Sequence, residues 1–311
     1  MRTQRYLVVS HDAGGAEVLS AWVRRHPETI CDFVLEGPAD SIFRRKLGEI
    51  DVLSRSAFED LKAYDLVLTG TSWASDLEKT AIIKAKESGK TVASYIDHWV
   101  NYKKRFVLNE VTTLPDEIWL GDEEALRIAA KSFPEGNLKL VPNPYFEDIK
   151  EEFMKIRPPA KSRADELHIL YVAEPVEDLA IKVFGDARHY GYTEFEALDG
   201  FLVSLGRSDF RMRAILRLRL HPSEKKGKYS QVLLRFSDIQ VEISEGNSLV
   251  QDCAWADWVV GCESMAMVIG ILGNKKVFTA IPYCGHPCRL PFEQVKNFNL
   301  ELQTLERQEM Q

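Results

Sequence analysis

Strand-like and helix-like segments alternate along most of the chain, and this alternation is what most constrains the fold. Short apolar runs end in turns rich in Gly, Ser or Asp and are followed by helical segments. This spacing is typical of βαβ units and a mainly parallel sheet. In the first half we expect strands at 6–10, 31–35, 65–69, 91–96 and 117–120. In the second half we expect them at 167–173, 214–220, 239–243, 258–260 and 276–281.

A polar, proline-bearing segment at 157–164 separates the two series of strands, as a linker would. The length of 311 residues suits two halves of Rossmann size. We therefore predict an α/β fold with two facing Rossmann-like domains, 1–157 and 158–311, and a deep cleft between them. The charged C-terminal helix could cross back onto the first domain.

Composition excludes several classes of protein. Apolar residues make up 45% of the chain and charged residues 28%, as in ordinary globular proteins. The net charge of -7 argues against nucleic acid as a partner. We see no apolar leader and no apolar stretch near the roughly 18 residues that span a bilayer. Five irregularly spaced cysteines indicate a reduced compartment. We expect a cytoplasmic protein without an integral membrane segment.

Cys284, His286 and Cys288 are candidate metal ligands, because two thiols and an imidazole lie close together in the sequence. Structural zinc normally takes four ligands from two paired elements, and no second CxxC or HxxxH accompanies this group. A proline-stiffened loop is the preferred interpretation, so we predict neither a metal nor another cofactor.

The strand predicted at 214–220 alternates arginine and leucine and ends in His221 and Pro222. Arg217 and Arg219 should share one face of the strand, with leucines on the other. Loops at the carboxyl ends of parallel strands converge on one crevice, where nucleotides bind. A histidine there can donate a hydrogen bond to phosphate or stabilise a departing nucleotide. The alternative for His221 is a buried histidine at a strand end.

A second candidate binding segment follows Gly261, where Glu263, Ser264 and Met265 begin an apolar helix. Free N–H groups and a hydroxyl suit phosphate, and the carboxylate suits ribose hydroxyls. The alternative for Ser264 is an ordinary helix N-cap, which is also the favoured interpretation of Ser248. Glu174 closes the first strand of this half and could contact the donor or lie in a solvated turn.

In the first half, polar residues follow three predicted strands. Asp12 on a glycine-containing loop is a candidate general base, with an N-cap as its alternative. Asp97 beside His98 is the rival acid/base candidate. No GxGxxG fingerprint is present. The candidate acceptor-binding residues are His11, Gly14, Gly15, Thr71, Ser72 and His98.

This layout resembles the GT-B glycosyltransferases. His221-Pro222 and the Glu263 to Met265 segment look like the donor motifs of bacterial transferases that use CMP-activated sialic acid, Kdo or related nonulosonic acids. The segments Tyr171–Pro175 and His11–Gly15 look like parts of enzymes of surface-polysaccharide biosynthesis. The acidic-acidic-glycine base motif of several sialyltransferase families is replaced here by Asp12-Ala13-Gly14.

The resemblance implies donor binding in the second domain, acceptor binding in the first, and metal-independent inversion. His221 would contact the CMP phosphate, Ser264 would assist, and Asp12 would be the base. The acceptor would be a glycan or a lipid-linked hydroxyl compound, which allows transient contact with a membrane surface. The alternatives are a CDP-glycerol-type phosphotransferase, a UDP-sugar 2-epimerase and a non-catalytic two-domain sugar-binding protein.

Overall fold

The computed structural model describes residues 3–72, 75–158 and 160–309. The chain divides into two compact units, Met1–Asp148 and Ile149–Gln311. The division falls within helix α5 (Pro144–Lys155), whereas we expected the boundary after residue 157. Along the described ranges, no helix combines the length and apolar character needed to cross a membrane.

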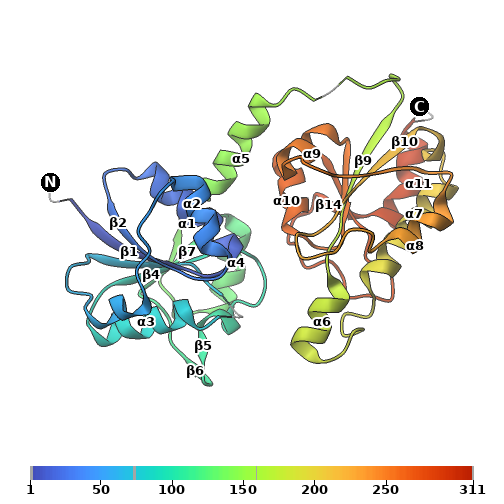
Figure 1. Cartoon of the computed structure of the whole chain (residues 1–311). Helices are drawn as coiled ribbons and strands as arrows, with labels where there is room; N and C mark the ends of the chain where they lie inside the picture. The colour runs from blue at the N-terminus through green and yellow to red at the C-terminus, as the bar shows by residue number, and fades with distance from the viewer. Residues whose placement is uncertain (1–2, 73–74, 159, 310–311) are drawn as a thin grey trace. The chain divides into compact units, whose positions relative to one another are not determined.

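The N-terminal unit is built around a parallel sheet. Its described strands are in the order β2-β1-β3-β4-β7-β8, so the chain moves to opposite sides of β1. Figure 1 shows α1 and α2 on one face of this sheet and α3 on the other. The strands are β1 Arg5–Ser10, β2 Ile30–Leu35, β3 Leu66–Thr69, β4 Val92–Ile96, β7 Glu117–Leu120 and β8 Leu138–Leu140; the helices are α1 Ala13–Arg25, α2 Pro38–Leu47, α3 Leu77–Glu87 and α4 Glu123–Ser132.

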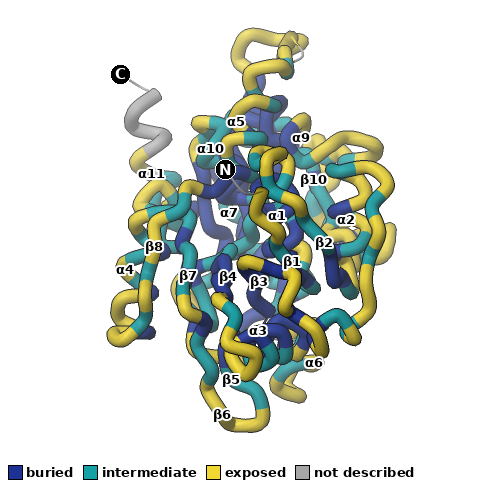
Figure 2. The backbone as a smooth tube through the Cα atoms, turned by 90° about the vertical axis from the view of Figure 1, so that its left-hand side faces the viewer, coloured by how far each residue is buried: buried dark blue, intermediate teal, exposed yellow. Residues whose placement is uncertain are grey.

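Burial on both faces explains why the central strands are apolar without alternation. All four residues of β3 and all five of β4 are buried. Parallel strands covered by helices on both sides require such continuous apolar runs. Figure 2 shows this contrast, with β3 and β4 buried and the β5–β6 hairpin (Val107–Leu108 and Val111–Thr112) exposed at its tip.

The C-terminal unit contains a second parallel sheet, with described strands in the order β11-β10-β9-β12-β13-β14. Here the chain moves to opposite sides of β9, between β10 and β12. The strands are β9 Leu167–Val172, β10 Ala214–Arg219, β11 Gln240–Ile243, β12 Trp258–Gly261, β13 Lys276–Thr279 and β14 Val295–Asn297; the helices are α6 Val176–Phe184, α7 Glu194–Arg207, α8 Ser230–Leu233, α9 Leu249–Trp255, α10 Met265–Leu272 and α11 Phe298–Glu309.

Strand β10 confirms the predicted alternation. Leu216 and Leu218 are fully buried in the core under α7, whereas Arg217 and Arg219 lie on the other face. Both arginines bind the buried carboxylate of Asp252 in α9, at 3.2 and 2.6 Å. The arginines therefore join strand to helix. The first residue of α11, Phe298, is buried in this same core, so the helix starts within the C-terminal unit.

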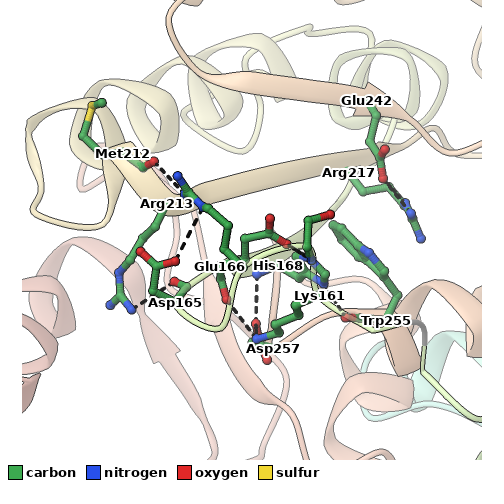
Figure 3. Close-up of polar contacts among 12 residues, drawn as sticks. Lys161, Asp165, Glu166, His168, Met212, Arg213, Arg217, Glu242, Trp255 and Asp257 are labelled. Carbon is green, nitrogen blue, oxygen red and sulfur yellow. Dashed lines mark hydrogen bonds and ion pairs between the residues drawn. The ribbon is translucent and has the colours of Figure 1, made fainter.

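Stacked polar and aromatic side chains connect β9, β10 and α9 (Figure 3). The rings of His168 and Trp255 are parallel, with centroids 4.4 Å apart. The guanidinium carbon of Arg217 lies 3.8 Å from the centre of the Trp255 ring, a cation–π contact. The segment before β9 is tied down by Lys161 and Asp257, whose Nζ and Oδ2 atoms are 2.7 Å apart.

Several elements were not expected from the sequence. Strands β8 and β14 have three residues each and lie at sheet edges. Because their residues are mostly exposed or half-buried, they lack an apolar run. Helix α6 was also not expected, and it exposes large apolar side chains, including Leu179 and Ile181.

Trp255→Ala should lower the free energy of unfolding by about 3–5 kcal/mol, because it removes a buried ring and leaves a cavity between His168 and Arg217. The control is Met212→Ala, at a side chain 82% exposed, where a change within about 0.5 kcal/mol is expected. Urea unfolding measures the free energy of unfolding of both variants. Equal losses in the two would contradict a stabilising role for the Trp255 stack.

Candidate functional site

In both units the predicted site residues lie after the carboxyl ends of neighbouring parallel strands. In the N-terminal unit, His11 and Asp12 follow β1, Thr71 follows β3 and Asp97 follows β4. β1 and β3 pair directly, and the strand order reverses between them. Such reversal points are where open α/β sheets bind ligands. The structure thus gathers the N-terminal candidates at one edge of the sheet.

His11 and Asp12 form a pair, with Nδ1 of His11 2.7 Å from Oδ1 of Asp12. Their side chains are 29% and 30% exposed. Asp12 occupies the N-cap position of α1, but its side chain makes no capping hydrogen bond. The alternative that Asp12 serves only as a helix cap is therefore wrong. A carboxylate that orients a partly exposed imidazole is suited to general acid–base work.

Asp97 is more enclosed than Asp12. Its Oδ1 atom accepts a hydrogen bond from Nη1 of Arg105 at 3.0 Å, in an ion pair whose side chains are 5% (Arg105) and 11% (Asp97) exposed. Its other oxygen lies against Gly14, where an added Cβ would be 1.9 Å from Oδ2. The glycine thus makes room for the carboxylate beside the start of α1.

Arg105 is a residue that sequence reasoning missed. Besides Asp97, its Nη1 donates to the carbonyl oxygen and to the Oγ1 of Thr71, at 3.0 and 2.9 Å. It therefore connects the loops after β3 and β4. Its only sequence signal is a basic run, Lys103 to Arg105, which looks like an exposed segment.

The predicted acceptor-binding hydroxyls support these loops from within. Thr71 and Ser72 are 1% and 0% exposed. The Oγ of Ser72 accepts the N–H of Ser75 at 2.9 Å. His98 is half-buried, and its Nδ1 accepts the N–H of Trp99 at 2.9 Å. Gly15 packs closely on Gly70, with an added Cβ 3.4 Å from its Cα.

A buried glutamate under this loop was also missed. Glu78 of α3 is 1% exposed, and its Oε1 accepts the N–H of His11 at 2.8 Å. Its Oε2 has no hydrogen-bond partner among the described residues. Burial is the main cause that raises the pKa of Glu78 to about 7. Its position in the first turn of a helix gave no sign of this environment.

In the C-terminal unit, Glu174 lies at the reversal point beside β9. Its Oε1 accepts the N–H groups of both Cys262 and Glu263, each at 2.9 Å. Burial is again the main cause that raises the pKa of Glu174, to about 7, while these N–H groups lower it. Glu174 thus joins the β9 loop to the loop after β12, and its carboxylate faces its own chain.

The two predicted serines occupy helix N-caps. Ser264 caps α10, with its Oγ accepting the N–H of Ala266 at 3.1 Å. Ser248 caps α9 in a capping box with Gln251. The N-cap interpretations of both serines are confirmed, and N-capping does not exclude ligand binding.

Glu263 and Met265 flank Ser264 at the start of α10. Glu263 forms an ion pair with Arg289, whose Nε is 3.1 Å from Oε1, and the Nε2 of His286 is 3.7 Å from the same oxygen. Its carboxylate is therefore already engaged in this structure. In the described ranges, no group of three or more His, Cys, Asp or Glu side chains is arranged to hold a metal ion.

His221 and Pro222 follow β10 and are exposed, so the alternative of a buried histidine is wrong. The loop is fixed by Glu224, whose Oε2 accepts the His221 N–H at 2.9 Å. Partial desolvation is the main cause that lowers the pKa of His221. Beside this loop lies a pocket of about 260 Å³. It is lined by Leu218, Leu220, Lys226, Gly227, Tyr229, Ser230, Leu233, Ile243 and Glu245.

Comparison with solved structures places this fold in a known architectural class. UDP-GlcNAc 2-epimerase from Neisseria meningitidis, bound to UDP-GlcNAc, matches with a TM-score of 0.61 and 12% identity, over 99% of this chain and 91% of that one. The UDP-GlcNAc 2-epimerase from Methanocaldococcus jannaschii, in complex with UDP-GlcNAc and UDP, matches with a TM-score of 0.58 and 10% identity, over 99% of this chain and 92% of that one. S. aureus MnaA with UDP matches with a TM-score of 0.58 and 13% identity, over 89% of this chain and 78% of that one.

These likenesses, at low sequence identity, establish the fold. The chain has two Rossmann-like α/β domains of the GT-B type, as the sequence predicted. No protein-family model matches the sequence, and no curated protein matches it either.

Gly14→Ala should destabilise the chain by about 1–3 kcal/mol, because the new methyl must displace the Asp97 carboxylate that Arg105 holds. Gly200→Ala is the control: it lies within α7 with open space around the added Cβ, and it should stabilise by about 0.5–1 kcal/mol. Urea unfolding measures both variants. If the free energy of unfolding changes in the same direction in both, the close packing of Asp97 on Gly14 is contradicted.

Glu174→Gln should become more stable than the wild type as the pH rises. The folded-state pKa of Glu174, about 7, is above the ordinary value of 4.5, so folding favours the protonated form. Stability is then lost as the pH rises from about 4.5 to about 7, and neutral glutamine avoids this loss. We expect little difference at pH 5 and an advantage of about 1–3 kcal/mol at pH 8.

Urea unfolding at both pH values measures this difference. Glu135→Gln, at an exposed position, is the control and should show no comparable change between pH 5 and pH 8. A Glu174→Gln advantage that stays constant with pH would contradict the buried state of the carboxyl group.

Proposed function

We propose that this chain is a nucleotide-sugar enzyme that acts on a UDP-sugar in a reaction of the 2-epimerase kind. Support comes from the fold, which aligns over 99% of the chain with a UDP-GlcNAc 2-epimerase bound to UDP-GlcNAc. It also comes from the side chains at the carboxyl edges of both sheets. This proposal takes up the epimerase alternative in preference to the CMP-sugar transferase.

The His11–Asp12 pair is the observation that carries the proposal. Inverting C2 by proton transfer requires one proton to leave and another to return on the opposite face of the sugar. In this proposal the C2–H electron pair forms a C1–C2 double bond as the C1–O bond to UDP breaks, and re-addition of UDP to C1 accompanies the return of the proton to C2. The chemistry needs positioned acid/base groups. His11 and Asp12 are 2.7 Å apart and partly exposed, at the same sheet edge as Asp97. These three side chains are the candidates for moving protons.

The C-terminal unit offers groups for the nucleotide. His221 is exposed at the end of β10, and the start of α10 follows β12. An imidazole N–H and the positive end of a helix both favour phosphate oxygens. In this proposal, His221 contacts the diphosphate, and the α10 loop with Ser264 and Met265 lines the same edge.

A CMP-sugar transferase is the second candidate. It is favoured by the position of His221-Pro222, which follows a parallel strand as the resemblance implies. An inverting transfer needs one base to deprotonate an acceptor hydroxyl, and Asp12 would serve. A glycan or lipid-linked acceptor and transient membrane contact belong to this candidate. A CDP-glycerol-type phosphotransferase would use the same edge with CDP.

The deciding experiment incubates the protein with UDP-GlcNAc in D₂O and follows the sugar by proton NMR. We expect deuterium at C2 and formation of the C2 epimer, because the removed proton exchanges with solvent. Asp12→Asn and Asp97→Asn should each slow exchange by at least about tenfold, corresponding to about 1.4 kcal/mol of barrier.

Nucleotide binding is measured separately, by thermal shift with UDP, CDP and CMP. A ligand at 100 times its Kd stabilises by about 2.7 kcal/mol. Stabilisation by CMP alone, with release of CMP from a CMP-sugar, would overturn the epimerase proposal in favour of the transferase. Binding of UDP-GlcNAc without exchange or turnover would instead support a non-catalytic binding protein.

A further inference from the structure

The segment from His221 to Glu224 forms a self-locked turn. The N–H of His221 donates to Oε2 of Glu224 at 2.9 Å, and the N–H of Glu224 donates to the His221 carbonyl oxygen at 2.8 Å. The two residues therefore satisfy each other's backbone groups. The turn follows β10, with Leu220 between the end of the strand and His221.

The ring of His221 is held by Ser223. The backbone N–H of Ser223 donates to Nδ1 of His221 at 3.2 Å, and the Ser223 Oγ lies 2.7 Å from the same nitrogen. A backbone N–H can only donate, so Nδ1 must accept and carry no proton. In neutral imidazole the single proton is then on Nε2. His221 is exposed, so this N–H is available to a ligand.

Glu224 is itself fixed from the other side. Its side chain is 0% exposed, and its Oε1 accepts the Tyr229 hydroxyl at 2.6 Å and the Lys228 ammonium at 2.9 Å. Lys228 also binds Glu194 at the start of α7 and lies 3.6 Å from Asp178 of α6. Through Lys228 the turn is therefore connected to two helices, α7 and α6.

Two charged groups act on the His221 ring. The carboxylate of Glu224 raises its pKa, and the ammonium of Lys228 lowers it. Desolvation is the largest cause and lowers the pKa, so the combined effect favours the neutral ring. Protonation at Nδ1 would also break the hydrogen bond from the Ser223 N–H.

We propose that Ser223 and Glu224 are positioning residues that hold His221 as a neutral Nε2–H donor for a phosphate oxygen of the nucleotide-sugar. The identity of the ligand rests on the proposed function, whereas the state of the ring does not. His221 would then bind phosphate without carrying a positive charge, so its contribution would persist at alkaline pH.

The ring state is tested without ligand, by long-range ¹H–¹⁵N NMR of the full chain at pH 8. His221→Ala identifies the His221 signals. We expect the Nε2–H tautomer for His221 and its retention in Ser223→Ala, which keeps the backbone N–H. A proton found on Nδ1 of the wild-type ring would overturn the proposal.

Glu224→Gln and Lys228→Met form an opposed pair for the charge argument. Glutamine keeps an acceptor for the His221 N–H but removes the negative charge, so the pKa of His221 should fall. Methionine removes the positive charge, so the pKa should rise. NMR titration measures the pKa of His221 in both variants, after circular dichroism has shown that the variants are folded. If the pKa of His221 shifts in the same direction in both variants, the role of this pair is overturned. If Lys228→Met does not fold, a rise in the pKa of His221 in Glu224→Gln alone overturns it.

The binding role is tested by calorimetry with UDP-GlcNAc between pH 6 and pH 8.5. We expect wild type to bind about tenfold more tightly than His221→Ala, corresponding to about 1.4 kcal/mol, with this ratio constant within about threefold. A ratio that falls about tenfold per pH unit would show that the charged ring binds, and would overturn the proposal. Absence of binding at every pH would overturn the proposed function, while NMR still decides the ring state.

Discussion

The reversal of strand order beside the first strand of each sheet is the constraint on which the rest of the structure depends. In the N-terminal unit it places β1 next to β3, and in the C-terminal unit it places β9 between β10 and β12. Loops that leave such strands diverge to opposite faces and leave an open edge between them. Most of the candidate side chains in both units follow strands at these two places.

A buried glutamate closes the loop at each reversal point. Glu78 accepts the N–H of His11, and Glu174 accepts those of Cys262 and Glu263. Both carboxyls have a pKa raised to about 7, with burial as the main cause. Each loop is thus held by a group that changes charge near neutral pH. In the C-terminal unit the two N–H groups belong to residues just before Ser264, the N-cap of α10, so Glu174 fixes the loop that leads into this helix.

The sequence was sufficient for the parts of the fold that depend on local pattern. Apolar runs identified β1, β3 and β4, the arginine–leucine alternation identified both faces of β10, and the serine after Gly261 marked the start of α10. Short edge strands were missed because three exposed or half-buried residues carry no pattern. The particular nucleotide could not be deduced, because an imidazole N–H and a helix start favour phosphate oxygens, which all the candidate nucleotides carry.

Partners that come from distant segments could not be predicted. Arg105 reaches Thr71 and Asp97, and Lys228 reaches Glu194, only because packing brings their elements together. In the sequence these residues look like exposed charges. The functional candidates at strand ends were therefore predictable, whereas the charged residues that hold them in place required the structure.

The central claim is that a nucleotide-sugar binds at the carboxyl edge of the C-terminal sheet. Hydrogen–deuterium exchange of the full chain, with and without saturating UDP-GlcNAc, tests it most directly. The account predicts slower exchange in peptides that cover His221–Glu224 and Cys262–Ala266, with no change around Trp255. Protection confined to the Trp255 region, or no protection in either predicted segment, would contradict it.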